Sequence, residues 1–221
     1  MSSATEMTPR LPSAKTNWQT PLLSLPFHQV GRKAGEVLAR HGHRRVAIFT
    51  PRPSDATAAY EKGLREAMRA DGGDLPPEFV FTSSVKHVYL SEREEEITAK
   101  LKAMLQREDR PTAIMTGFDP DAEFLYLLLS QLGIKVPDDI SLISFGGAER
   151  DSAIFQKVTA ITVDEAELGR KAALWLYEMH DGERAIDDAE EYVMPLGLSE
   201  GLTVGPVPSR PGPLLSETIK T

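Results

Sequence analysis

Four loops carry the side chains of this sequence that are best placed to contact a ligand. Each loop follows a predicted strand, and together they span residues 50–55, 82–84, 116–119 and 144–149. In open α/β sheets, ligands gather at the carboxyl ends of parallel strands, because loops and helix N-termini there present unpaired hydrogen-bond donors. The charged candidates in these loops are Arg52, Asp55 and Asp119. Each aspartate can instead cap a helix, and Arg52 can instead be a solvated loop residue.

No catalytic or metal-binding pattern accompanies these candidates in the sequence. The chain has no cysteine, which excludes thiolate ligands, and its five histidines lack the HExxH spacing of a zinc site. Residues 31–35, GRKAG, precede a strand, so they predict close helix packing and not a dinucleotide-binding loop. Residues 144–148, SFGGA, form a glycine turn without the GxSxG pattern of an exposed nucleophilic serine. We therefore expect no enzyme activity, no cofactor and no metal.

A regular alternation of helix and strand patterns surrounds the four loops. Helices are predicted at residues 29–41, 55–70, 92–107, from 119 to about 132, and from 164 to about 181. Strands are predicted at residues 44–50, 79–82, 112–116, up to about 145, and near 192–196. Helices between apolar strands imply parallel strands, joined by right-handed crossovers and covered by helices on both faces. The predicted fold class is therefore α/β, with a parallel doubly wound sheet.

Several residues mark the expected ends of these helices. Pro120 lies in the first turn of the helix that follows Asp119, and Gly133 lies where that helix should end. Two pairs have the spacing of a capping box, namely Ser91 with Glu94 and Asp164 with Glu167. The apolar face expected for the last helix consists of Leu168, Ala172, Leu176 and Met179.

The composition indicates a folded domain between two loose tails. Residues 1–24 are rich in serine, threonine and proline without periodicity, and residues 206–221 repeat proline. The 41% hydrophobic content of this 221-residue chain is enough for a substantial core, which we place at residues 25–205. Because the chain has no apolar run near the roughly 18 residues of a membrane span and no secretory signal pattern, we expect a cytoplasmic protein without a membrane partner.

The charge of the chain argues against nucleic-acid binding by these residues alone. The formal net charge is −8 and the isoelectric point is about 5.2, whereas nucleic-acid backbones are held by clustered lysine and arginine. The basic residues at 40–45 are explained as a solvated helix end, where cations face the negative end of the helix dipole.

Residues 110–145, RPTAIMTGFDPDAEFLYLLLSQLGIKVPDDISLISF, resemble a run in the effector-binding domain of the LacI/GalR family of bacterial transcriptional regulators. The family pattern reads PTAI…ND…A…L…GL.VP.DIS..GFD. The runs GRKAGEVLARHGHRRVAIFT and VTAITVDEAELGRKAALWLYEM resemble two further parts of that domain, in the same order. The resemblance covers about residues 29–206. It implies a type I periplasmic-binding-protein-like lobe, mainly the C-terminal subdomain and incomplete relative to the family.

The positions that match the family's ligand-contacting pattern have unusual residues in this chain. Tyr60 stands where the family has an arginine, and Phe118 replaces the asparagine of the ND pair, whose aspartate is retained as Asp119. Gly146 and Gly147 stand where the family's GFDD run has its aspartates. Losing guanidinium and carboxylate groups removes the bidentate hydrogen bonds that hold sugar hydroxyls. Tyr60 and Phe118 can instead stack on a sugar face or an aromatic ligand, or can be core residues.

The resemblance implies a ligand-sensing and dimerising role in a LacI/GalR-type regulator. The expected partners are a small-molecule effector, such as a sugar or a related compound, and a second copy of the chain, contacted through residues 119–132. DNA would be contacted only through a helix-turn-helix, which these 221 residues lack, so we expect a fragment of a longer regulator or one with a truncated start. The alternative is a ligand-free dimerisation module that has lost sugar binding.

Overall fold

The computed structural model describes residues 21–51, 54–82, 94–150, 153–185, 189–209 and 213–215. The chain divides into two compact units. The larger unit comprises Leu25–Ala166 and Met194–Thr221, and the smaller unit comprises Met1–Ser24 and Glu167–Val193.

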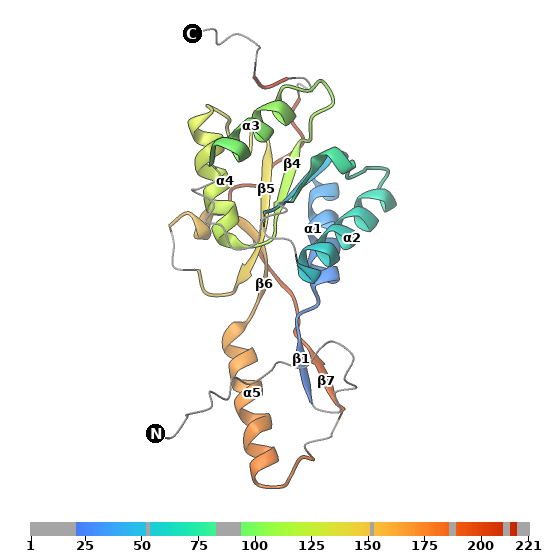
Figure 1. Cartoon of the computed structure of the whole chain (residues 1–221), viewed down its shortest axis with the longest axis vertical. Helices are drawn as coiled ribbons and strands as arrows, with labels where there is room; N and C mark the ends of the chain where they lie inside the picture. Colours follow the sequence, from blue (N-terminus) through green and yellow to red (C-terminus); the bar gives the residue numbers. More distant parts are fainter. Residues whose placement is uncertain are drawn as a thin grey trace, which may run out of the picture. The chain divides into compact units, whose positions relative to one another are not determined.

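The larger unit is built on a six-stranded sheet with the strand order β3-β2-β4-β5-β6-β8 (Figure 1). Its strands are β2 (Val46–Thr50), β3 (Val80–Thr82), β4 (Ala113–Thr116), β5 (Ser141–Gly147), β6 (Thr159–Val163) and β8 (Gly197–Ser199). All neighbouring pairs are parallel except β6 with β8, which pair antiparallel at one edge. The predicted α/β class with a parallel sheet is confirmed.

Helices cover both faces of this sheet. They are α1 (Phe27–Arg40), α2 (Asp55–Ala70), α3 (Glu94–Leu105) and α4 (Asp119–Gln131), with short 3₁₀ turns at Pro77–Phe79 and Phe155–Lys157. Figure 1 shows α1 and α2 on one side of the strands and α3 and α4 on the other. Ala47 and Phe49 of β2 join the apolar core formed with α3 and α4. Since side chains alternate along a strand, Val46 and Ile48, which are also buried, face the opposite side.

Helices α1 and α2 approach each other through glycines, as the GRKAG pattern predicted. A Cβ atom on Gly31 would overlap the backbone carbonyl of Tyr60, and one on Gly63 would overlap the carbonyl of His28. Any larger residue at these positions would push the two helices apart. The contact matters for the site because it fixes Tyr60 on α2.

The end of α4 follows the expectation for Gly133. This residue has φ +75°, which favours glycine, and its N–H donates to the carbonyl of Ser130 at 3.0 Å. The N–H of Ile134 donates to the carbonyl of Leu129 at 2.9 Å, which completes a Schellman motif. Pro120 occupies the first turn of the helix, as predicted.

The boundaries of the expected tails differ from the sequence-based prediction. Leu22–Ser24, expected to belong to a loose tail, form strand β1. Beyond residue 206, the N–H of Val207 donates to the carbonyl of His41 at 3.0 Å, and that of Leu214 donates to Leu105 at 2.9 Å. The strand expected near 192–196 is wrong, because the chain makes two short strands in different sheets, one on either side of Pro195.

The smaller unit contains a two-stranded parallel sheet and most of one helix. Strand β1 (Leu22–Ser24) pairs with β7 (Glu191–Val193), and α5 (Glu165–His180) belongs to this unit from Glu167 onward. Trp175 is the one fully buried residue of α5, and its ring meets Tyr192 edge-on at 6.5 Å between centroids. Lys171 and Arg184 lie over the Trp175 ring at 5.4 and 4.8 Å.

Two general properties follow from the described residues. None of their helices is both long and apolar enough to cross a membrane. Within the same residues, no group of three or more acidic, histidine or cysteine side chains is placed to hold a metal ion.

Candidate ligand-binding site

The carboxyl ends of β2, β4 and β5 bring together most of the residues predicted to form a site. Phe118 and Asp119 follow β4, and Gly146 and Gly147 end β5. Tyr60 reaches the same region from α2, as its ring contacts with these strand ends show. Asp55 opens α2, while Arg52 lies outside the described residues.

Four aromatic rings form one cluster at this end of the sheet. Tyr60 meets Phe118 edge-on at 6.3 Å between ring centroids and lies 5.9 Å from Phe145. Phe118 and Phe145 are 6.3 Å apart, and Phe27 meets Tyr60 edge-on at 5.3 Å. These distances and the mostly tilted or edge-to-face geometry are favourable for aromatic pairs. The four rings therefore pack against one another. This packing explains why Tyr60 and Phe118 stand where the family has polar residues.

Exposure to solvent divides the cluster into a floor and a surface. Tyr60 is fully buried and Phe145 is 4% exposed, whereas Phe118 is 38% exposed. The Tyr60 hydroxyl is buried and has no hydrogen-bond partner among the described residues. Burial raises the pKa of Tyr60, with a further contribution from the charge of Asp121. Tyr60 is thus a core residue, and Phe118 is a partly exposed ring at the surface of the cluster.

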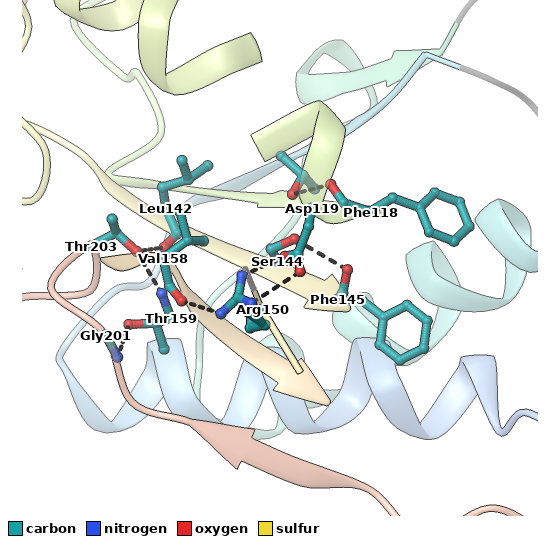
Figure 2. A network of polar contacts seen from close by, with 11 residues as sticks. Phe118, Asp119, Leu142, Ser144, Phe145, Arg150, Val158, Thr159, Gly201 and Thr203 are labelled. Carbon is teal, nitrogen blue, oxygen red and sulfur yellow. Dashed lines mark hydrogen bonds and ion pairs between the residues drawn. The ribbon is translucent and has the colours of Figure 1, made fainter. Parts of the chain in front are cut away.

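Asp119 is held in a buried ion pair beside this cluster (Figure 2). Its Oδ1 accepts a hydrogen bond from Nη2 of Arg150 at 2.6 Å, and its Oδ2 accepts one from Nε of Arg150 at 3.0 Å. The third nitrogen, Nη1, donates to the carbonyl of Val158 at 2.6 Å. The two side chains are only 9% and 4% exposed. Burial raises the pKa of Asp119, while hydrogen bonds from Ser144 and Arg150 act in the opposite direction.

The two glycines at the end of β5 are crowded by carboxylates. A Cβ atom on Gly146 would overlap the carboxylate of Asp119, and one on Gly147 would overlap that of Glu165. Gly146 therefore makes room for the Asp119–Arg150 pair. An aspartate at position 146 would place a second carboxylate against Asp119, which the present arrangement excludes.

A network of hydrogen bonds anchors the start of β6, directly after the Val158 carbonyl (Figure 2). The Thr203 hydroxyl donates to the carbonyl of Leu142 at 2.6 Å and accepts from the N–H of Thr159 at 2.9 Å. The Thr159 hydroxyl accepts from the N–H of Gly201 at 3.1 Å. The 201–205 segment thus ties β5 to the start of β6, so the acceptor for Arg150 lies on a fixed element.

Neither Asp55 nor Asp119 caps a helix, although the sequence allowed both to do so. Ser54, not Asp55, caps α2: its hydroxyl accepts from the N–H of Thr57 at 3.2 Å, in a capping box with the Thr57 side chain. Helix α4 begins at Asp119 with Phe118 as its N-cap, and no side chain caps it. Serine is as good a cap as aspartate, which explains the first difference, and the pairing with Arg150 explains the second.

Arg150 is the residue that the sequence reasoning missed. It lies one position beyond the predicted 144–149 loop, 31 residues from its partner Asp119. The available signal was that an aspartate at a strand end is seldom buried without a cation. Applying that rule to the basic residues that flank the four loops would have drawn attention to Arg150.

Two surface hollows lie away from the strand-end residues. One of about 420 Å³ lies between the 3₁₀ turn Pro77–Phe79, β3 and α3, and is lined by Phe81, Lys100 and Arg107 among others. Another of about 270 Å³ lies beside the end of α1 and contains Arg40, Glu200 and Gly201. Neither contains a residue predicted to contact a ligand.

Comparisons with known proteins agree with this architecture. A family described as a periplasmic binding protein-like domain matches residues 36–204. The arabinose metabolism transcriptional repressor of Geobacillus stearothermophilus is 27% identical over 167 residues, which are 76% of this chain and 45% of the relative. The ribose operon repressor of Escherichia coli K12 is 31% identical over 147 residues, which are 64% of this chain and 41% of that protein.

A solved structure shows the same fold. A LacI family transcriptional regulator from Enterococcus faecium, with bound ribose, superposes with a TM-score of 0.68 at 21% identity. The match covers 87% of this chain and 68% of that one. The chain spans less than half the length of the two curated relatives named above.

Proposed function

We propose that this chain, which belongs to the periplasmic binding protein-like domain family of the LacI-type regulators, is the small-molecule-sensing part of a transcriptional regulator. Relatives named as the arabinose metabolism repressor and the ribose operon repressor support a sensor of small molecules. They support this reading over that of an enzyme on the same kind of sheet. Since a regulator acts on promoter DNA, we place the protein in the bacterial cytoplasm.

The observation that carries the proposal is the exposed ring of Phe118 at the carboxyl end of β4. It stands on a floor formed by Tyr60 and Phe145, at the edge of the sheet where ligands of such folds bind. An exposed aromatic side chain in that position offers a face on which a flat or apolar ligand surface can stack. Ligand binding there would change the equilibrium between states of the regulator.

Self-association belongs to the same proposal. Several large apolar side chains remain exposed, among them Leu127 of α4 at 47% and Leu176 and Tyr177 of α5 at 67% and 59%. Exposed apolar surface of this kind marks protein interaction sites. We propose a homodimer, with the α4 residues 119–132 or the exposed side of α5 as its contact surface.

The second candidate is a dimerisation module that no longer binds a ligand. One observation favours it: both oxygens of the Asp119 carboxylate already accept hydrogen bonds from Arg150. A site whose charged group is already paired offers a sugar little hydrogen bonding. The two candidates differ in one outcome, which is whether any small molecule stabilises the protein.

A thermal-unfolding screen separates these candidates. The purified chain would be heated with sugars, nucleosides and aromatic acids, each at several millimolar. A ligand present at 100 times its Kd stabilises the native state by about 2.7 kcal/mol, which raises the melting temperature by several degrees. We expect at least one compound to do so, and a Phe118→Ala variant to lose the shift while keeping its own melting temperature. A flat response to every compound would favour the ligand-free module.

A further inference from the structure

The geometry points to Arg150 as the residue that sets ligand selectivity at this site: it withholds Asp119 from polyhydroxylated ligands and leaves the site to uncharged planar aromatic compounds. This inference rests on the proposed sensing function and names the chemical class of ligand. It concerns which compounds bind, so it can fail while the sensing function stands.

The first step is the bidentate hydrogen bonding of Asp119 by Arg150. Both carboxylate oxygens accept from the guanidinium, at 2.6 and 3.0 Å. Such a bidentate pair is the arrangement that a carboxylate would otherwise make with adjacent hydroxyls of a sugar. The guanidinium therefore occupies the bidentate face of the carboxylate that a polyol ligand would use.

The second step is that separating Arg150 from Asp119 has a high free-energy cost. Arg150 uses its remaining terminal nitrogen on the Val158 carbonyl at 2.6 Å, and its side chain is only 4% exposed. A hydroxyl that displaced Arg150 from Asp119 would leave a buried guanidinium without its counterion. Breaking one side of a buried ion pair is strongly unfavourable, and a neutral hydroxyl does not compensate for it.

The third step is that Gly146 leaves the space that the Asp119–Arg150 ion pair occupies. Because a Cβ atom there would overlap the Asp119 carboxylate, the pair fits only next to glycine. Gly146 also brings no side-chain acceptor to the strand end. The glycine and Arg150 thus act together, one giving the carboxylate room and the other neutralising it.

The last step concerns what remains for a ligand to contact. Phe118 presents 38% of its surface, and its ring lies within 6.3 Å of both Tyr60 and Phe145. A planar, uncharged aromatic compound gains stacking and apolar burial on this ring without needing Asp119. A sugar with only hydroxyls gains the smaller part of that contact and meets an Asp119 carboxylate that is already paired with Arg150.

The test measures binding of two kinds of probe by calorimetric titration of the full chain. The aromatic probes are indole, adenine and nicotinamide, and the polyol probes are D-ribose and cellobiose. We expect at least one aromatic probe to bind the wild type, with affinity lowered about tenfold or more in Phe118→Ala, and both polyols to bind at least about tenfold more weakly than that probe.

Substitution of Arg150 sharpens the test. Arg150→Gln frees the Asp119 carboxylate, so ribose affinity should rise about tenfold or more while affinity for the aromatic probe stays within about twofold. If this variant does not fold, Asp119→Asn with Arg150→Gln removes both charges together and should bind the aromatic probe like the wild type. Arg184→Gln is the matched control, since Arg184 pairs with Glu178 and Glu190 in the smaller unit and should alter neither affinity.

Each contrary outcome has a distinct meaning. Wild-type binding of ribose that is lost in Asp119→Asn would overturn the role of Arg150 and leave the sensing function intact. Aromatic binding that is unchanged in Phe118→Ala would overturn the aromatic site. If none of the five probes binds the wild type, the inferred ligand class is wrong, and the broader thermal screen decides separately whether the chain senses any small molecule.

Discussion

The two units of this chain bury the same kinds of apolar side chain to very different extents. In the larger unit, Leu125 and Leu129 of α4 are fully buried against a sheet that carries helices on both faces. In the smaller unit, α5 faces a sheet of two strands, and Leu176 is 67% exposed. Two-stranded sheets are marginal by themselves, because they offer too little apolar surface for a helix to cover. The comparison shows that burial depends on the layer that a helix meets as well as on its own pattern.

The apolar face predicted for α5 illustrates this difference. Leu168, Ala172, Leu176 and Met179 were expected to be buried together, but Leu176 is exposed and Trp175 is the fully buried residue. The bulky indole fills the space over Tyr192 and is flanked by the cations of Lys171 and Arg184. Once Trp175 faces the sheet, its neighbour at position 176 is turned away.

A matched pair of leucine truncations gives the largest expected contrast between the units. Leu129→Ala removes a fully buried side chain from the larger core, so we expect a loss of about 2 to 5 kcal/mol in the free energy of unfolding. Leu176→Ala should change that free energy by less than about 0.5 kcal/mol, because the side chain is mostly exposed. Urea unfolding of both variants measures the difference. Equal losses would contradict the contrast in burial.

The pH dependence of stability should reflect a buried histidine of the larger unit. His43 is fully buried; its Nε2 donates to the carbonyl of Gly205 at 3.1 Å, and its Nδ1 accepts from the Thr112 hydroxyl at 2.9 Å. This assignment follows because a carbonyl can only accept. Burial lowers the pKa of His43 from 6.5 to about 4, with smaller contributions from the charges of His41 and Arg44.

Because the folded pKa of His43 lies below the unfolded one, the unfolded chain binds more protons between pH 4 and 6.5. The stability contribution is complete above pH 6.5 and is lost as the pH falls towards 4, by up to about 3 kcal/mol at roughly 1.4 kcal/mol per pH unit. Thermal unfolding between pH 4 and 7.5 measures this slope, and a His43→Gln variant should show a shallower one. An identical slope in the variant would rule out His43 as its source.

Self-association should depend on the unit that leaves apolar side chains uncovered. Leu176→Glu places a charge at the most exposed large apolar residue of α5, and we expect it to raise the dimer dissociation constant about tenfold. Leu127→Glu on α4 tests the surface favoured by sequence reasoning and should have a smaller effect, because its apolar neighbours Leu128 and Leu129 are buried. Sedimentation equilibrium would compare the two. A monomeric wild type at tens of micromolar would contradict the proposed dimer altogether.

The sequence predicted four of the six strands of the larger unit, β2 to β5, because their signals are local, whereas β6 and β8 were not predicted. Pro120 and Gly133 mark the ends of α4, and GRKAG correctly indicated the close contact of α1 with α2. The pairing of β1 with β7 joins residues about 170 positions apart and leaves no local pattern. Such pairings depend on which surfaces remain unoccupied after the rest of the chain has folded, so they escape a reading of neighbouring residues.

The convergence of the candidate residues was predicted from the sequence, whereas the pairing of Asp119 was not. Tyr60, Phe118, Asp119 and the glycines of β5 do converge, since strand ends of a parallel sheet share one edge. Whether the Asp119 carboxylate is free to bind a ligand depends on Arg150. The Arg150 side chain comes from a loop whose sequence has no periodic pattern. Whether a residue at a shared edge is free or paired is decided by three-dimensional proximity alone.

The central claim, that the exposed Phe118 ring is where this sensor meets its ligand, is tested most directly by calorimetric titration of the best-stabilising compound against two variants. Phe118→Ala should weaken binding about tenfold or more, through loss of stacking and buried apolar area, with little change in melting temperature. Leu127→Ala removes a side chain of α4 that is 47% exposed and should leave the affinity unchanged. Equal affinities in the wild type and Phe118→Ala would contradict the account.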